Sequence, residues 1–212
     1  MSAALLASEI PADVSGWWVS EKLDGIRAMW TGTALLSRNG KDLKAPAWFT
    51  ATLPKDIRLD GELWMGRGTF DNLVSTIQRK DSDWTGVEFH VFDVQAPGTF
   101  EERQHLLNRQ LPRHVRVVPH LECAGHDALD AMEVAVVNAG GEGLVIRRPG
   151  HKYRPGRAGD VVKVKRLFPD LDRWQGGWRA PTARAGTLWA HPPEPNKKSR
   201  GFSASGLLDY QK

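Results

Sequence analysis

The spacing of hydrophobic and polar positions changes along the chain, and this change predicts a mixture of strands and helices. In residues 68–80, Phe70, Leu73, Val74 and Ile77 repeat at the i, i+3, i+4, i+7 spacing of a helix. Residues 86–94 alternate as a strand does. The predicted helices cover residues 68–80, 99–111 and 126–141, and the predicted strands cover 16–30, 34–40, 57–65, 86–94, 115–122, 142–149 and 160–167.

Short sequence signals mark several ends of these elements. Asn39-Gly40 predicts a tight turn, and Thr99 and Glu102 have the spacing of a capping box. Gly140 and Gly141 are expected to close the third helix. The order shows no regular βαβ alternation, which favours an α+β fold with mostly antiparallel sheets and flanking helices over residues 1–167.

Residues 168–212 have a different composition from the rest of the chain. They hold three tryptophans among scattered proline and glycine, and no period of 2 or 3.6 persists. We therefore expect an irregular or disordered C-terminal tail after residue 167.

The overall composition limits the class of protein. The 212 residues are 41% hydrophobic and 25% charged, as in a soluble globular chain, and the net charge of +4 suits a polyanionic partner without establishing one. The single cysteine, Cys123, excludes an internal disulfide and zinc sites built from several cysteines. No membrane span or signal peptide is predicted, so we expect a cytoplasmic protein, or a periplasmic one if a leader precedes this start.

Two strands place charged side chains on one face. Lys163 and Lys165 alternate with valines, so they point the same way and repel each other unless an anion lies between them; a solvated strand face is the alternative. Asp60 and Glu62 also share a face, and Glu142 is predicted to share one with Leu144 and Ile146. Each acid either lies at the mouth of a pocket or is an exposed or ion-paired strand end.

The strand 86–94 carries an aromatic residue on each face. Phe89 and Val91 lie on one side, and His90 and Phe92 lie on the other. One face should be core, and an aromatic side chain on the other could stack on a planar ligand. The alternative for Phe92 is that it packs in the core. His90 could act as an acid or base, and the alternative is a packing or hydrogen-bonding role.

The order of these groups resembles a known family. The series is Lys-x-Asp-Gly-x-Arg (22–27), Ser-Arg-Asn-Gly (37–40), Asp-Gly-Glu (60–62), Phe-x-x-Phe-Asp (89–93), Glu-Gly-Leu-Val-Ile-Arg (142–147) and Lys-Val-Lys (163–165). It resembles the motif series of the covalent nucleotidyltransferases, which include ATP-dependent DNA ligases, RNA ligases and mRNA capping enzymes. The flanking text, such as "GWWVSEKLDGIRA", is similar to the small bacterial ATP-dependent DNA ligases over about residues 5–167.

The resemblance implies an ATP-grasp-like adenylation domain that acts as a monomer on nicked duplex DNA. Lys22 would attack the α-phosphate of ATP, pass AMP to a 5′-phosphate at a nick, and the 3′-hydroxyl would then expel AMP. It also implies roles for other residues: Glu62 for the ribose, Phe92 for adenine, Arg38 for the ribose or a nick phosphate, Lys163 and Lys165 for the α-phosphate, Glu142 for Mg²⁺ (or Mn²⁺), with Glu21 and Arg27 in the same nucleotide site.

The chemistry requires a neutral amine, whereas a free lysine has a pKa near ~10.4. Arg27, Lys163 and Lys165 would supply the cationic field that favours the neutral form, and Glu21 and Asp24 would oppose it if they are close. Outside the motifs, Arg67, Arg79 and Lys80 are candidates for duplex phosphate contacts, with solvated surface charge as the alternative.

The C-terminal part departs from the family pattern. DNA ligases of this kind continue into an OB-fold after Lys-Val-Lys, but only 47 residues follow Lys165 and they lack five alternating strands. We expect the OB-fold to be absent, truncated or scrambled by a frameshift, and sealing to suffer more than nucleotide binding. The alternatives are an RNA ligase or capping-type enzyme, and a degenerate protein that only binds nucleotide or DNA ends.

Overall fold

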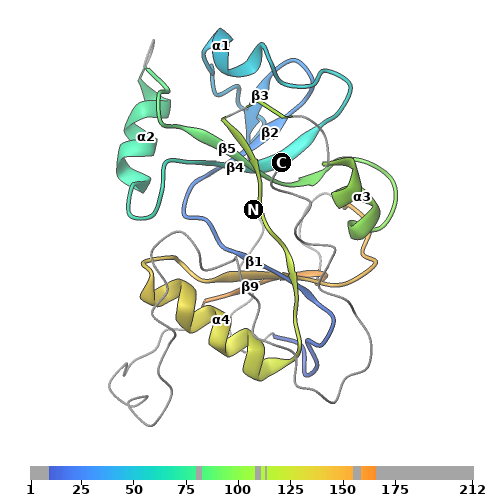
Figure 1. Ribbon diagram of the computed structural model, residues 1–212. Coiled ribbons are helices and arrows are strands. Elements are labelled where there is room, and N and C mark those ends of the chain that lie inside the picture. The colour runs from blue at the N-terminus through green and yellow to red at the C-terminus, as the bar shows by residue number, and fades with distance from the viewer. Residues whose placement is uncertain (1–9, 80–82, 108–110, 113, 155–158, 166–212) are drawn as a thin grey trace. The chain divides into compact units, whose positions relative to one another are not determined.

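The computed structural model describes residues 10–79, 83–107, 111–112, 114–154 and 159–165. All of them belong to one compact unit of the chain. The predicted tail, residues 168–212, lies outside the described residues, as does Lys80. The described elements form two sheets with helices packed on them (Figure 1).

The larger sheet has five strands in the order β3-β2-β4-β5-β6. They are β2 (Ile26–Trp30), β3 (Leu35–Ser37), β4 (Leu59–Trp64), β5 (Glu88–Val94) and β6 (Val115–Val117). Every neighbouring pair is antiparallel except β5 and β6, which are parallel.

The smaller sheet has four strands in the order β7-β1-β8-β9, all antiparallel. They are β1 (Trp18–Glu21), β7 (Leu121–Glu122), β8 (Leu144–Arg147) and β9 (Val161–Val164). The prediction of an α+β fold with mostly antiparallel sheets is therefore confirmed.

Four helices accompany the sheets in the described part of the chain. They are α1 (Ala47–Thr50), α2 (Phe70–Gln78), α3 (Phe100–Leu106) and α4 (His126–Asn138). The capping box of α3 is present, with the Thr99 side chain accepting from the Glu102 amide. The helix α1 was not predicted, because its four residues are too short to show a period. Helix α4, yellow in Figure 1, packs on β8, and α3 packs on β5.

The main hydrophobic core covers one face of the five-stranded sheet. Leu59 and Leu63 of β4 and Phe89 and Val91 of β5 are at most 1% exposed there. Removing side chains of this size from water stabilises the fold by about 1.5–3 kcal/mol each. The opposite face of these strands is left for the polar residues that alternate with the core residues.

Two stretches predicted as single strands are split between the sheets. Residues 16–30 form β1 and β2 in different sheets, joined through Gly25, where a Cβ atom would lie 2.2 Å from the Leu63 carbonyl oxygen. Residues 115–122 likewise divide into β6 and β7 around Pro119, which cannot donate a ladder hydrogen bond. Both breaks bring residues of the two sheets to one cavity.

Candidate active site

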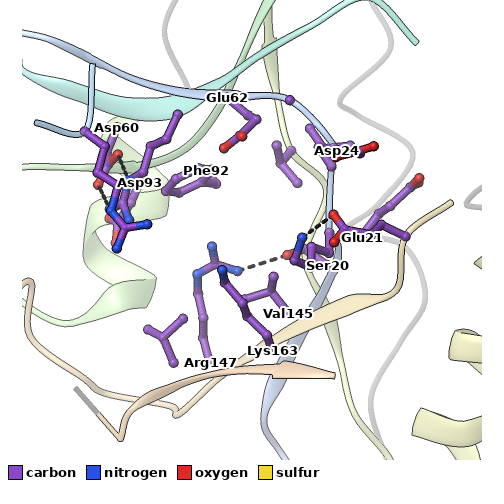
Figure 2. A pocket seen from close by; sticks show the side chains of 18 of the residues that line it. Ser20, Glu21, Asp24, Asp60, Glu62, Phe92, Asp93, Val145, Arg147 and Lys163 are labelled. Carbon is purple, nitrogen blue, oxygen red and sulfur yellow. Dashed lines mark hydrogen bonds and ion pairs between the residues drawn. The ribbon is translucent and has the colours of Figure 1, made fainter. Parts of the chain in front are cut away.

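A cavity of about 530 Å³ is lined by residues of both sheets. Because the core face of β4 and β5 is apolar, their other face brings charged and aromatic side chains to the cavity. Residues of β8 and β9 form a second wall. Figure 2 shows Asp60, Glu62 and Phe92 on one side and Val145, Arg147 and Lys163 on the other.

Lys22 lies directly after β1, with its amide donating to the Gly143 carbonyl at 2.8 Å. Its ammonium forms an ion pair with the Glu142 carboxylate, which also accepts from Lys165 Nζ at 3.3 Å. Burial alone would raise the pKa of Glu142, but the hydrogen bonds and charges of Lys22 and Lys165 lower it overall.

The prediction that Glu142 shares a strand face with Leu144 and Ile146 is wrong. Glu142 precedes β8, and Gly143 between them has φ +144, a conformation that side chains rarely adopt. The alternation therefore begins only at Leu144, which is buried together with Ile146 on the other side. The backbone conformation of Gly143 therefore directs the Glu142 carboxylate toward the cavity, although Leu144 and Ile146 point away from it.

The predicted lysine pair has its valines on the buried side, since Val162 and Val164 are at most 1% exposed. Lys163 lines the cavity, and its pKa is lowered by burial and then by the charge of Lys22. Lys165 follows the last residue of β9 and is 54% exposed, so it reaches the site by its contact with Glu142.

The two acids of β4 both line the cavity, as their shared face predicted. Asp60 is buried and accepts two hydrogen bonds from Arg27, from Nε at 3.0 Å and from Nη2 at 2.7 Å. The Glu62 pKa is raised to about 8, because burial outweighs the opposing charges of Arg27, Lys22 and Lys163. Near neutral pH this carboxyl group is therefore largely protonated and can both donate and accept hydrogen bonds.

Phe92 faces the cavity, whereas Phe89 and Val91 belong to the core, which confirms the predicted division of β5. The guanidinium carbons of Arg27 and Arg147 lie 5.5 and 5.3 Å from its ring centroid. Such distances allow cation–π attraction. The ring is thus held at the cavity wall by charged neighbours.

Three further predicted residues border the cavity in different ways. Arg38 is exposed in the turn after β3, and Asp24 is exposed after Lys22. Glu21 also lines the cavity, but both of its carboxylate oxygens accept from Arg67 at 2.8 Å. The negative charge of Glu21 is therefore compensated by an arginine next to the site.

Arg147 was not predicted to be a site residue, although it belongs to the motif Glu-Gly-Leu-Val-Ile-Arg at 142–147. Arg147 is 6% exposed, donates to the Ser20 hydroxyl at 2.9 Å, and lines the cavity beside Phe92. Burial lowers the pKa of Arg147 to about 10. The strand face that it shares with Val145 was the available signal, but burial of a single arginine could not be inferred from it.

A partly buried network that includes residues of the cavity wall was also not predicted. Arg103 of α3 donates to both carboxylate oxygens of Asp93, at 2.7 and 3.0 Å, and to the His151 carbonyl at 3.0 Å. Tyr153, two residues later, donates to Asp60 at 2.8 Å. Burial and then the Asp60 charge raise the pKa of Tyr153 to about 12. This network joins the β8–β9 connection to β4 and β5. Contacts such as His151 to Arg103 and Tyr153 to Asp60 join residues far apart in the sequence, so no local sequence pattern predicts them.

Other predicted features lie away from the cavity. His90 is 3.1 Å from Glu88 and packs edge-on against Trp64, which supports a packing and hydrogen-bonding role. Cys123 is a buried free thiol. No helix within the described ranges is long and apolar enough to cross a bilayer. Among the same residues, no three His, Cys, Asp or Glu side chains gather as metal ligands.

Comparison with known proteins assigns the chain to a family. A family model described as the ATP dependent DNA ligase domain matches residues 8–165. The chain belongs to the ATP-dependent DNA ligase family. The matched residues of this ligase-family chain include every described residue that lines the cavity.

Individual relatives agree with this assignment. A DNA ligase from Haemophilus influenzae is 35% identical over 159 residues, which cover 72% of this chain and 59% of that ligase. The chain thus spans well under two thirds of that relative's length. A solved structure from a study of Lig E DNA ligases is 36% identical with a TM-score of 0.72, covering 78% of this chain and 68% of the other.

A more distant structure shares the fold. The Chlorella virus DNA ligase-adenylate is 21% identical, with a TM-score of 0.60 over 78% of this chain and 69% of that one. At this identity the likeness shows the fold alone, and the roles of the residues in this chain depend on its own cavity.

Proposed function

We propose that this chain is the adenylation part of an ATP-dependent DNA ligase, with Lys22 as the nucleophile. One observation carries the proposal: Lys22, Glu62, Phe92 and Lys163 line a single cavity in a chain of this family. An amine, a hydrogen-bonding carboxyl, an aromatic face and a second cation are what a nucleoside triphosphate requires for stacking, ribose recognition and phosphate binding.

The proposed reaction begins with the neutral amine of Lys22. Its Nζ forms a bond to the α-phosphorus of ATP, the bond from that phosphorus to the bridging oxygen breaks, and pyrophosphate leaves. The nitrogen loses a proton, so the product is AMP held on lysine as a phosphoramidate. Lys163 and Lys165 would stabilise the negative charge on the α-phosphate oxygens as the bond forms.

The other cavity residues would bind the nucleotide. Phe92 would stack on adenine, Glu62 would hydrogen-bond the ribose hydroxyls, and Arg38 would meet the ribose or a nick phosphate. Arg27 is held in the cavity by Asp60 and would contact the phosphates from there. Glu21 would border the nucleotide, with its carboxylate engaged by Arg67.

A magnesium ion fits this donor set, with Mn²⁺ as an alternative. Mg²⁺ is commonly held by one or two carboxylates together with phosphate oxygens and waters, so a single protein carboxylate with a bound triphosphate suffices. Glu142 would hold the ion, which supplies charge stabilisation for the phosphates when bound. In this structure, the ammonium groups of Lys22 and Lys165 both form ion pairs with the Glu142 carboxylate.

Nicked duplex DNA is the proposed substrate of the later steps, in which AMP passes from Lys22 to a 5′-phosphate at the nick and the 3′-hydroxyl then expels AMP. The chain would act as a monomer in the cytoplasm, where ATP is available. The proposed boundaries are an adenylation domain at residues 1–167 followed by the compositionally different segment 168–212. A nick with a labelled 5′-phosphate, joined in DNA but not in the matching RNA duplex, would support DNA as substrate.

The proposal is tested by incubating the protein with Mg²⁺ and ATP labelled at either the α- or the γ-phosphate. The α-label should remain on the denatured protein and the γ-label should not. Added pyrophosphate should remove the α-label again as ATP. If the wild-type protein takes no α-label, or Lys22→Ala takes as much as the wild type, the proposal is wrong.

A further inference from the structure

Arg67 connects two segments that end next to the candidate site. It lies in the loop between β4 and α2, and its Nε and Nη2 atoms each donate to a Glu21 carboxylate oxygen at 2.8 Å. Its Nη1 donates to the Ala139 carbonyl at 3.1 Å. We refer to Arg67, Glu21 and Ala139 as the Arg67 clasp.

The partners of Arg67 adjoin the two residues that form the central ion pair. Glu21 is the last residue of β1 and directly precedes Lys22. Ala139 caps the C-terminus of α4, three residues before Glu142. The clasp therefore ties the Glu21 side chain, next to Lys22, and the Ala139 backbone, close to Glu142, to a third segment of the chain.

The geometry of the clasp makes it stronger than an ordinary surface ion pair. It is bidentate and charge-assisted, and the Glu21 side chain is only 11% exposed. The hydrogen bonds of Glu21 raise the pKa of Arg67 above its usual value. The guanidinium also satisfies a carbonyl at the C-terminus of α4, where the helix dipole favours a cation.

The packing around Glu21 is matched to this arrangement. A Cβ atom at Gly141 would lie 2.9 Å from Glu21 Oε1 and 2.5 Å from the Val136 side chain. The absence of a side chain at Gly141 thus leaves room for the Glu21 carboxylate beside the end of α4. This places Glu21 against the segment that leads into Glu142.

We infer that Arg67 is a positioning residue for lysine adenylylation: through Glu21 and Ala139 it holds Lys22 and Glu142 in place across the cavity. This role rests on the proposed function. The positioning role differs from the expectation, drawn from the sequence, that Arg67 contacts duplex phosphates. The three nitrogen atoms of its guanidinium are already engaged within the chain.

Single-turnover labelling of the full chain with α-labelled ATP tests this role. Arg67→Ala should lower the rate constant at saturating ATP by about tenfold, with the ATP concentration at half-maximal rate nearly unchanged, because positioning and not nucleotide contact is lost. Arg67→Lys should not restore the rate, since lysine lacks the bidentate fork. Arg116→Ala, which removes an exposed arginine–glutamate ion pair with Glu88 outside the cavity, is the matched control and should label at the wild-type rate.

A double-mutant cycle connects the effect to the clasp. Glu21→Gln should lower the rate constant as well, and the double variant Arg67→Ala/Glu21→Gln should be no slower than the slower single variant. Additive losses, or a wild-type rate in Arg67→Ala together with weaker binding of nicked DNA, would overturn the inference in favour of a DNA contact.

Amide hydrogen exchange separates failure of this inference from failure of the proposed function. In Arg67→Ala, exchange should increase in peptides covering residues 20–24 and 139–143, while the core strand β5 stays protected. Unchanged exchange in both peptides would contradict the clasp even if the wild-type protein took no label. Absence of label with increased exchange would instead overturn both the proposed function and the positioning role in it, leaving only a structural clasp.

Discussion

At the residue scale, Phe92 differs from its neighbours in β5 because it is not part of the core. Phe89 and Val91 are fully buried, whereas Phe92 lines the cavity between two guanidinium groups. Truncating such a ring should cost little fold stability but should remove a stacking surface for a planar ligand.

Replacing Phe92 therefore tests the adenine contact. In Phe92→Ala the dissociation constant for ATP should rise by about tenfold or more, because stacking of a base on an aromatic ring contributes about 1–3 kcal/mol. Phe92→Tyr keeps the ring and should bind nearly as the wild type does. Titration calorimetry measures both, and equal affinities for ATP in the alanine variant and the wild type would rule out stacking at this position.

Glu62 gives a pH-dependent prediction at the same scale. Its pKa is about 8 in the folded protein against a reference value of 4.5. Between these values the unfolded state ionises while the folded state keeps the proton, so ionisation favours unfolding as pH rises. The penalty is absent below the reference value, grows through this range and is complete above about pH 8.

The variant Glu62→Gln lacks this penalty. It should be more stable than the wild type by roughly 1–2 kcal/mol at pH 8.5 and equally stable near pH 4. Urea unfolding at the two pH values measures the difference. A variant that is less stable at pH 8.5 would show that Glu62 is ionised and favourably paired in the folded protein.

At the element scale, alternation predicted the faces of single strands but not the breaks between them. The inward and outward residues of β4 and β5 follow from sequence because they alternate without interruption. The direction of Glu142 could not be predicted, because Gly143 interrupts the period. Pro119 ends one strand and allows the next to join a different sheet.

The contacts in and beside the cavity that the sequence did not predict depend on partners far along the chain. Arg67 meets Glu21, Arg147 meets Ser20 and Tyr153 meets Asp60, each across more than 40 residues. No periodic pattern encodes such pairs, whereas the motif series located most of the other cavity residues through family resemblance. Which lysine and which acid contact each other became clear only from the fold.

The α3 helix offers a stability prediction. Arg103 is fully buried and bonds Asp93 and two carbonyl groups, so Arg103→Ala would leave the Asp93 carboxylate buried without its cation. We expect the free energy of unfolding to fall by about 3–5 kcal/mol. The neighbouring exposed His105→Ala should change it by less than about 0.5 kcal/mol. Equal effects of the two substitutions in urea unfolding would contradict a structural role for the buried pair.

At the scale of the whole molecule, the family match ends before residue 168. Residues 8–165 match the ligase domain, and among the described residues, which end at 165, Lys163 is the last that lines the cavity. Removal of residues 168–212 should therefore leave the rate of self-labelling within about threefold of the full chain. A truncated protein with a native circular dichroism spectrum but no label would show that the tail contributes to adenylylation.

The central claim is that Lys22, and not the neighbouring Lys163, carries AMP. Both amines line the cavity, and Lys163 has the lowered pKa that also suits a nucleophile. Mass spectrometry of peptides from the protein after incubation with ATP and Mg²⁺ distinguishes them. The account predicts the AMP adduct on the peptide that contains Lys22, and an adduct on Lys163, or on neither lysine, would contradict it.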